Sequence, residues 1–344
     1  MGCCIVNNNP YTSVAMKKVL FRADANQSIG IGDLMSLIHL SRYFEADDWE
    51  SFFLIKDYSA GLRLIAEYSV NNLKVIDKEF ATPDEVEVIN GYINDKGIDL
   101  LFLVITEKKL SEYAGLSSGA KKACVSFDGA IVPDLDLVVD WDVAAADFFE
   151  PESFPNTNFL LGPEYVILPI EFDSDRIRNR KYNSTPEKLL ICMGGSDELN
   201  LTQKIVNTLI HHKVSLKTTI VVGAGYEYRE QLEQSIQGKA GLFVIKQNVS
   251  TMFAEYMSCD VAIGTGGLTS SELVATRTPA ALVAACEHQI ARCRFFHEQM
   301  WCRYLGYRTF NSAELLDFIS NPIYQTEVNI FHTRKIMESV NELF

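Results

Sequence analysis

The chain has 344 residues, a length that corresponds to roughly two domains at about 150 residues each. Hydrophobic residues make up 47% of it and charged residues 22%, as in a soluble globular protein, and the formal net charge is −14. A field of this sign repels phosphate backbones and anionic lipid, so nucleic acid and membrane surfaces are not expected partners. The sequence has neither an apolar run of about 18 residues nor a signal-peptide pattern. We therefore expect a cytoplasmic protein.

The cysteine and histidine spacings do not match known metal or disulfide patterns. None of the eight cysteines forms a C-x-x-C pair, and several lie in apolar runs such as LLICMGG. The histidines show no H-E-x-x-H spacing. We therefore expect reduced, buried thiols, no metal site and no cofactor.

In chain order, residues 1–15 have no periodicity and are expected to be a disordered extension. The first half, residues 16–172, then alternates apolar runs with amphipathic stretches such as 34–44 and 85–93. The apolar runs predict buried parallel strands at 19–21, 51–55, 73–76, 98–105, 123–127 and 135–141. This alternation predicts an N-terminal Rossmann-like domain.

A charged, turn-rich stretch at 173–188 is expected to be a linker, and the alternation resumes after it. Strands are predicted within 188–195, 218–225, 241–247, 260–267 and 279–285. Helices are predicted at 201–212, 229–236, 250–258 and 268–276, with a long helix from about His288. We expect a second Rossmann-like domain over 189–322 and a C-terminal helix within 323–344 that returns to the first domain. Two βαβ sheets of similar size predict an α/β protein with a ligand cleft between its domains.

Three glycine-rich turns each follow an expected strand and precede an expected helix: residues 29–33 (IGIGD), 192–197 (CMGGSD) and 264–272 (GTGGLTSSE). Glycine lets backbone N–H groups approach a ligand, and the amides at a helix N-terminus favour a bound phosphate. Glu272, one turn into the third helix, can accept hydrogen bonds from a ribose diol. The alternative for each turn alone is a tight connection with capping hydroxyls. Two such turns in one half favour a nucleotide, and the missing G-x-x-x-x-G-K-[ST] run excludes a P-loop NTPase.

Longer motifs carry a family resemblance. They occur in this order: FRADANQSIGIGD, VSFDG with DLDLVVDW, GPEYVILPIEF, LLICMGGSD, and GGLTSSELVATRTPAALVAACEHQ. Over residues 17–310 the chain resembles the UDP-2,4-diacetamido-2,4,6-trideoxy-β-L-altropyranose hydrolases of pseudaminic acid biosynthesis. That family is similar to the MurG-type glycosyltransferases and has the GT-B fold. The resemblance implies a GT-B enzyme of bacterial surface-glycan or nonulosonic acid biosynthesis.

The resemblance implies that the C-terminal half binds the nucleotide. The diphosphate would lie near Gly194, Gly195 and Ser196, and the base near residues 248–250. The residues matching the part of the family motif that holds the α-phosphate and ribose, and the glutamine near the bound UDP, are Gly267, Leu268, Thr269, Ser270, Glu272 and Gln289.

The sugar-binding half departs from the family pattern. Where the family turn has G-x-G-H-x-x-R, this chain has Asp33 in place of the histidine and Ser36 in place of the arginine. The family's Asp-x-Tyr after the fourth strand is replaced by residues 104–106 (VIT), and its L-L-R-P-E-F by residues 167–172 (ILPIEF). These departures all fall on the side that would hold the sugar or acceptor.

Two accounts of Asp33 fit these departures. In the first, Asp33 is the catalytic base, because a dry cleft raises the pKa of a carboxylate enough for it to take a proton. In the second, Asp33 only caps the helix. The residues expected to line the substrate cleft with it are Arg22, Asp24, Gly30, Gly32 and Asp128. The alternative for Asp24 and Asp128 is a strand-end turn role, and for Arg22 a solvated surface position.

These features predict an enzyme that cleaves the bond between the anomeric carbon and the diphosphate oxygen of a UDP-linked sugar. The acceptor is water if the hydrolase resemblance extends to the reaction, and a hydroxyl if the altered half marks a glycosyltransferase. A third hypothesis is a non-catalytic protein that binds a nucleotide sugar. The retained nucleotide half supports all three equally.

Overall fold

The computed structural model describes residues 16–26, 31–104, 113, 115–116, 119–126, 134–247, 249, 251–325, 331 and 333–344. The extension expected at residues 1–15 lies outside them. By internal contacts the chain divides into two compact units, Met1–Ala123 and Cys124–Phe344. The domain boundaries expected at 172 and 188 stay a prediction.

The first sheet has seven strands in the order β3-β2-β1-β4-β5-β6-β7. The strands are β1 (Lys18–Arg22), β2 (Glu50–Lys56), β3 (Leu73–Ile76), β4 (Leu100–Val104), β5 (Lys121–Val125), β6 (Leu137–Asp140) and β7 (Asn158–Leu161). The pairs β1–β2, β2–β3, β1–β4 and β6–β7 are parallel. Every residue of β4 is buried, as expected for a parallel strand covered on both faces.

Helices α1 (Gly32–Ala46), α2 (Ser59–Glu67) and α3 (Thr82–Lys96) follow β1, β2 and β3 in turn. Aromatic side chains bind α1 to this sheet. The ring of Phe21 on β1 lies 5.4 Å from that of Phe44 on α1 and 5.1 Å from that of Phe53 on β2. These ring contacts pack α1 and β2 against β1.

The C-terminal helix α12 (Thr333–Asn341) contacts β6 and the short η3 (Pro163–Tyr165). The hydroxyl of Thr333 donates to the carbonyl of Val166 and accepts from the amide of Leu168. Between β6 and η3 lie α4 (Ala145–Phe148), η2 (Pro151–Ser153) and β7, and η4 (Ile170–Asp173) and α5 (Asp175–Arg178) come after η3.

The second sheet has six parallel strands in the order β10-β9-β8-β11-β12-β13. They are β8 (Lys188–Cys192), β9 (Lys217–Val222), β10 (Phe243–Gln247), β11 (Val261–Thr265), β12 (Ala280–Ala284) and β13 (Arg303–Tyr307). Alternate residues of β8 face opposite sides of the sheet and pack into two separate hydrophobic clusters. Leu189 and Ile191 of β8 belong to one buried cluster, and Leu190 and Cys192 belong to the other.

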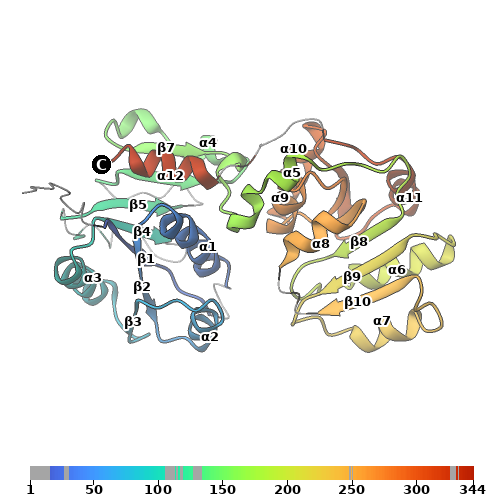
Figure 1. The fold of residues 1–344 in the computed structure, drawn as a ribbon, viewed down its shortest axis with the longest axis horizontal. Helices are drawn as coiled ribbons and strands as arrows, with labels where there is room; N and C mark the ends of the chain where they lie inside the picture. Colours follow the sequence, from blue (N-terminus) through green and yellow to red (C-terminus); the bar gives the residue numbers. More distant parts are fainter. Residues whose placement is uncertain are drawn as a thin grey trace, which may run out of the picture. The chain divides into compact units, whose positions relative to one another are not determined.

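Helices cover both faces of this sheet (Figure 1). The first cluster includes residues of α6 (Leu201–His211), α7 (Arg229–Ser235) and α11 (Ser312–Ser320). The second includes residues of α8 (Met252–Ser258), α9 (Leu268–Ala275) and α10 (Gln289–Glu298). The result is a doubly wound α/β layer with the strand order typical of a Rossmann fold. Both domains are thus parallel-sheet α/β structures, as the sequence predicts.

Two strands were not expected from the sequence, and one helix is shorter than expected. β7 has only four residues and follows a turn-rich stretch, so it lacks a long apolar run. β13 is an edge strand in which Arg303, Tyr304 and Tyr307 are half-buried or exposed, so it lacks the long apolar run that predicts the other strands. The helix expected from about His288 ends at Glu298 because the chain turns there into β13.

The stretch expected to be a linker makes hydrogen bonds to residues that precede β11 and β12. The guanidinium of Arg180 donates to the carbonyls of Thr276 and Cys259 and to the hydroxyl of Thr278.

Within the described ranges, no helix is both long and apolar enough to cross a bilayer.

Candidate functional site

The strand order of the second sheet reverses between β8 and β11, so the loops that follow these two strands lie side by side. Cys192 at the end of β8 is in register with Gly264 of β11. Open α/β sheets bind ligands at the carboxyl ends of the strands where the order reverses. The second and third glycine-rich turns of the sequence therefore meet at the expected binding position.

A cavity of about 240 Å³ opens at this edge. Its size is just under the range of about 300–1,000 Å³ for small-molecule sites, which suits one nucleoside-sized group. Its lining residues lie on β8 and β9 and in the segments that follow β8, β9, β10 and β11. They are Cys192, Gly194, Gly195, Val221, Val222, Gly223, Val249, Met252, Tyr256, Thr269 and Glu272.

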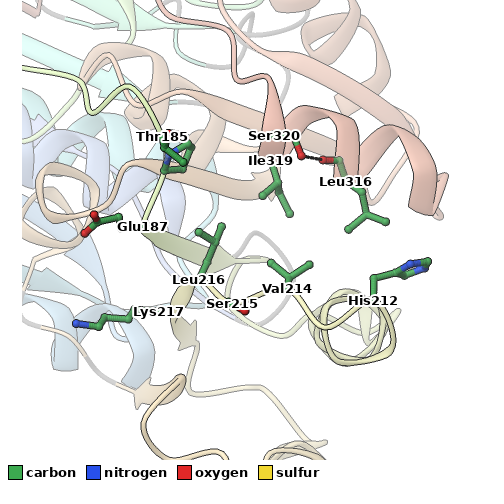
Figure 2. A pocket seen from close by; sticks show the side chains of 11 residues that line it. Thr185, Glu187, His212, Val214, Ser215, Leu216, Lys217, Leu316, Ile319 and Ser320 are labelled. Atoms are coloured by element: carbon green, nitrogen blue, oxygen red, sulfur yellow. Dashed lines mark hydrogen bonds between the residues drawn. The ribbon is translucent and has the colours of Figure 1, made fainter.

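A larger groove of about 800 Å³ lies at the opposite edge of the same sheet, where β8 and β9 begin (Figure 2). Figure 2 shows Lys217 and His212 at opposite ends of it, with Val214, Leu216 and Ile319 between them. Its polar groups do not converge on one point, and it lies away from the carboxyl ends of the strands. We therefore place the functional site at the smaller cavity.

Glycines at the cavity serve two different purposes. A Cβ at Gly223 would collide with the backbone of Gly195, and one at Gly266 would collide with the Cys293 thiol, so close packing explains both. A Cβ at Gly195 would meet no described atom within 4 Å, and its φ is not positive. Neither packing nor backbone conformation requires glycine at Gly195, so the backbone at this position is open to approach from outside. Gly194 differs, because its φ of +90° itself requires glycine.

Asp197, in the same turn, has a structural role that the sequence reasoning did not assign. Its two carboxylate oxygens accept from the amides of Leu201 at 2.9 Å and Thr202 at 2.8 Å, in the first turn of α6. Burial raises the pKa of Asp197, and these amides partly offset that effect. The N-terminus of α6 is thus capped by the protein's own carboxylate. Gly194, Gly195 and Ser196 stay exposed beside it.

The N-terminus of α9 differs from that of α6. Gly267 is its N-cap, and its first turn contains no acidic residue. Its amides and dipole therefore favour an anion supplied from outside. Leu268 is exposed, whereas the buried Ser270 donates its hydroxyl to the carbonyl of Gly267 at 2.6 Å. Thr269 lines the cavity.

Gln289 begins α10 near Gly267. Its Oε1 accepts from the amide of Ala285, and its Nε2 lies 3.5 Å from the position a Cβ would take at Gly267. The side chain is thereby held over the turn that precedes α9. The nucleotide-binding residues expected from the sequence thus gather around one edge of the sheet.

Glu272 carries the strongest electrostatic feature of the cavity. The hydroxyl of Tyr256 donates to its Oε2 at 2.7 Å. Burial raises the pKa of Glu272, the hydrogen bond from Tyr256 lowers it, and the nearby carboxylate of Glu171 raises it further. The cavity therefore holds a desolvated carboxylate positioned to accept hydrogen bonds. Tyr256 has no distinctive sequence signal, because its spacing from Phe253 on α8 matches an ordinary core position.

The first unit places Asp33 in the first turn of α1, where the helix N-terminus favours a carboxylate anion. The N-cap position is occupied by Ile31, which makes no side-chain capping bond, and Asp33 is the second helical residue after it. The helix-capping interpretation of Asp33 stays a prediction. Gly32 is exposed at the first helical position, and a Cβ there would meet no described atom within 4 Å. Close packing therefore does not explain why the residue at position 32 is a glycine. The role of Asp33 as a base stays a prediction.

Arg22 and Asp24 lie in a buried ionic network. Arg22 is 5% exposed and donates to Glu85 and Asp24, each at 2.7 Å. Asp24 also accepts from the amide of Lys56. These contacts give both residues structural partners, so the substrate contacts expected for them have no support from this arrangement. Gly30 and Asp128 lie outside the described residues, as do Asn248 and Ser250 of the base-binding turn.

In the part of the chain that the structure describes, no three His, Cys, Asp or Glu side chains are grouped in a way that could hold a metal ion. Buried thiols have pKa values above their usual range because burial disfavours the thiolate. This holds for Cys124, Cys192, Cys259 and Cys302.

Comparison with known proteins yields partial sequence relatives. No family model matches the chain. The uncharacterized protein MJ1062 of Methanocaldococcus jannaschii is 25% identical over 159 residues, which cover 45% of this chain and 32% of that protein. The spore coat polysaccharide biosynthesis protein SpsG of Bacillus subtilis is 25% identical over 146 residues, 42% of each protein. The matched region is thus less than half of either relative.

Solved structures match nearly the whole chain. Acinetobacter baumannii MurG superposes with a TM-score of 0.60 at 14% identity, covering 87% of this chain and 88% of that one. The UDP-GlcNAc 2-epimerase of Methanocaldococcus jannaschii gives 0.61 at 10%, covering 95% and 99%. S. aureus MnaA in its UDP co-structure gives 0.58 at 9%, covering 95% and 97%. At these identities the likeness establishes the fold: the chain consists of two parallel-sheet α/β domains of the GT-B type.

Proposed function

We propose that the protein binds a UDP-linked sugar and cleaves the bond between its anomeric carbon and the diphosphate oxygen. The observation that carries the proposal is the cavity at the strand-order reversal of the second sheet, which combines the buried carboxylate of Glu272 with the open backbone at Gly195. The named relatives support it, since SpsG is a polysaccharide biosynthesis protein and MnaA has a structure with UDP.

Each part of the nucleotide has a counterpart at this edge. The base fits against the apolar side chains of Val249 and Met252, and the ribose hydroxyls can donate to Glu272. The diphosphate would then lie along the exposed Gly195 turn and the N-terminus of α9. Neither turn contains a lysine or arginine, so backbone amides and the helix dipole supply the positive potential. The same groups would stabilise the diphosphate as it leaves in the transition state.

In this proposal Asp33 is the general base on the sugar side. It removes a proton from the attacking water, the water oxygen bonds to the anomeric carbon, and the bond to the diphosphate oxygen breaks, which releases UDP and the free sugar. A glycosyltransferase is the second candidate. The sugar-side departures favour it, since Asp33 and Ser36 replace the histidine and arginine of the hydrolase pattern. In that case a hydroxyl of the acceptor takes the place of water.

The test is UDP release from a panel of UDP-sugars, with and without candidate hydroxyl acceptors, alongside UDP binding by calorimetry. Wild type is compared with Asp33→Asn and with Asp84→Asn, a matched control in the first turn of α3. We expect turnover to fall by about 100-fold or more in Asp33→Asn, as for loss of a general base. UDP binding should be unchanged in Asp33→Asn, and Asp84→Asn should behave as wild type.

The outcomes separate the candidate functions. UDP release in water alone supports the hydrolase, and release only with an acceptor supports the transferase. Binding of UDP without turnover of any sugar leaves a non-catalytic nucleotide-sugar-binding protein. Failure of wild type to bind UDP rejects the nucleotide assignment.

A further inference from the structure

Tyr256 lies between the core of the second domain and the cavity. It is fully buried on α8, and its ring lies 6.4 Å from that of Phe172. Its hydroxyl reaches Oε2 of Glu272 at 2.7 Å, and its pKa is far above the usual range because of burial and the neighbouring Glu272 carboxylate. The hydroxyl therefore acts as a hydrogen-bond donor, held in place by a ring that packing prevents from moving.

This bond fixes both the position and the availability of the carboxylate. Because the Tyr256 hydroxyl donates to Oε2 of Glu272, the other carboxylate oxygen, Oε1, is the one that can accept a hydrogen bond from a ligand in the cavity. Without the tyrosine hydroxyl, the buried carboxylate would lose a donor that favours its ionised form. It could also rotate away from the cavity, because χ torsions of a glutamate cost little to change.

We infer that Tyr256 is a positioning residue for ribose recognition: it holds Glu272 so that the carboxylate accepts from the ribose hydroxyls and discriminates a ribonucleotide from a deoxy analogue. The inference rests on the proposed UDP site. It predicts that removing the one hydroxyl group that bonds to Glu272 weakens the selection for ribose and leaves the rest of the binding energy in place.

The experiment measures calorimetric affinities of UDP and of 2′,3′-dideoxy-UDP, which lacks both ribose hydroxyls. Wild type should prefer UDP, and Tyr256→Phe should reduce that preference by about tenfold, the effect of losing a hydrogen bond to a charged group. Affinity for dideoxy-UDP should stay within about twofold, because the aromatic ring is retained. The matched control is Tyr182→Phe, which removes a hydroxyl that donates to the carbonyl of Arg277, away from the cavity.

The double variant Tyr256→Phe/Glu272→Gln tests whether the two residues act as a unit. It should lose no more ribose preference than Glu272→Gln alone, because the inferred effect of Tyr256 on the ribose passes through Glu272. Glu272→Gln also keeps the inference testable if Tyr256→Phe does not fold, since unchanged ribose preference in Glu272→Gln would overturn it.

Other outcomes are distinct. Equal losses for both ligands in Tyr256→Phe would assign the tyrosine to packing and overturn the inference. An unchanged ribose preference in Tyr256→Phe would also overturn the inference, but it would not contradict the proposed UDP site. If wild type binds UDP without any ribose preference, Glu272 does not contact the ribose and the inference is again overturned. If wild type binds neither ligand, the proposed function itself fails.

Discussion

At the residue scale, the most concentrated charge in the first unit is the network around Glu85, which is fully buried on α3. Its Oε1 accepts from Arg22 at 2.7 Å and from the hydroxyl of Tyr113 at 2.9 Å, and its Oε2 lies 3.5 Å from Nζ of Lys56. Burial acts to raise the pKa of Glu85, but Arg22, Tyr113 and Lys56 together outweigh it, so the pKa is lowered. Glu85 thus faces two buried cations, and Arg22 pairs with Asp24 as well.

Glu85→Gln should destabilise the protein by about 3 kcal/mol, because it keeps the shape of the side chain and removes one of the two carboxylates that neutralise the buried cations of Arg22 and Lys56. The measurement is urea denaturation, with Glu87→Gln on the exposed face of the same helix as control. A loss no larger than that of the control would show that the network contributes nothing to stability.

The lowered pKa of Glu85 also fixes a pH dependence. Its contribution to stability is fully present above the usual glutamate value of 4.5 and is lost as the pH falls through the lower pKa of the folded state. The stability difference between wild type and Glu85→Gln should therefore shrink on acidification below that value. A difference that grows in acid would contradict this assignment.

At the scale of elements, helix α6 depends on a residue outside itself. Its formal N-cap, Asn200, has a left-handed backbone and makes no side-chain capping bond, and Asp197 caps the helix from the preceding turn. Asp197 also adopts a positive φ of 43°, which aspartate and asparagine tolerate better than alanine.

Asp197→Ala should therefore lower stability by about 1–2 kcal/mol, from the lost cap and the strained backbone together. Asp197→Asn retains one acceptor and the tolerance for positive φ, so it should lose less. Thermal and urea denaturation of the two variants check the order. Equal losses in both variants would contradict this order. They would mean that the single oxygen acceptor kept by asparagine does not cap α6.

How far the sequence predicts these elements depends on their burial. Strands such as β4 and β11 are buried throughout, so their apolar runs mark them directly. β13 is half-exposed and has one buried residue, Leu305, so no apolar run marks it as a strand. At the site, glycine turns and Glu272 were predictable from spacing and chemistry. Tyr256 was not, because a buried tyrosine on a helix has the same pattern whether or not its hydroxyl reaches a functional carboxylate.

At the scale of the whole molecule, a net charge of −14 does not attract a diphosphate, so affinity must come from local groups at the cavity edge. Ligand binding at this edge links to the stability of the folded chain, since a ligand that binds only the folded state stabilises it. At about 100 times its dissociation constant the gain is about 2.7 kcal/mol. UDP should therefore raise the melting temperature by several degrees.

Gly195→Ala tests where that stabilisation originates. A Cβ at Gly195 has open space among the described residues, so the variant should fold with unchanged stability. The added methyl group would occupy the backbone surface that the diphosphate approaches, so UDP affinity should fall by at least about tenfold, and the thermal shift at a fixed UDP concentration should shrink with it. Gly241→Ala is the matched control, because Gly241 is equally open and lies before β10, away from the cavity. A full thermal shift in Gly195→Ala would place the diphosphate elsewhere.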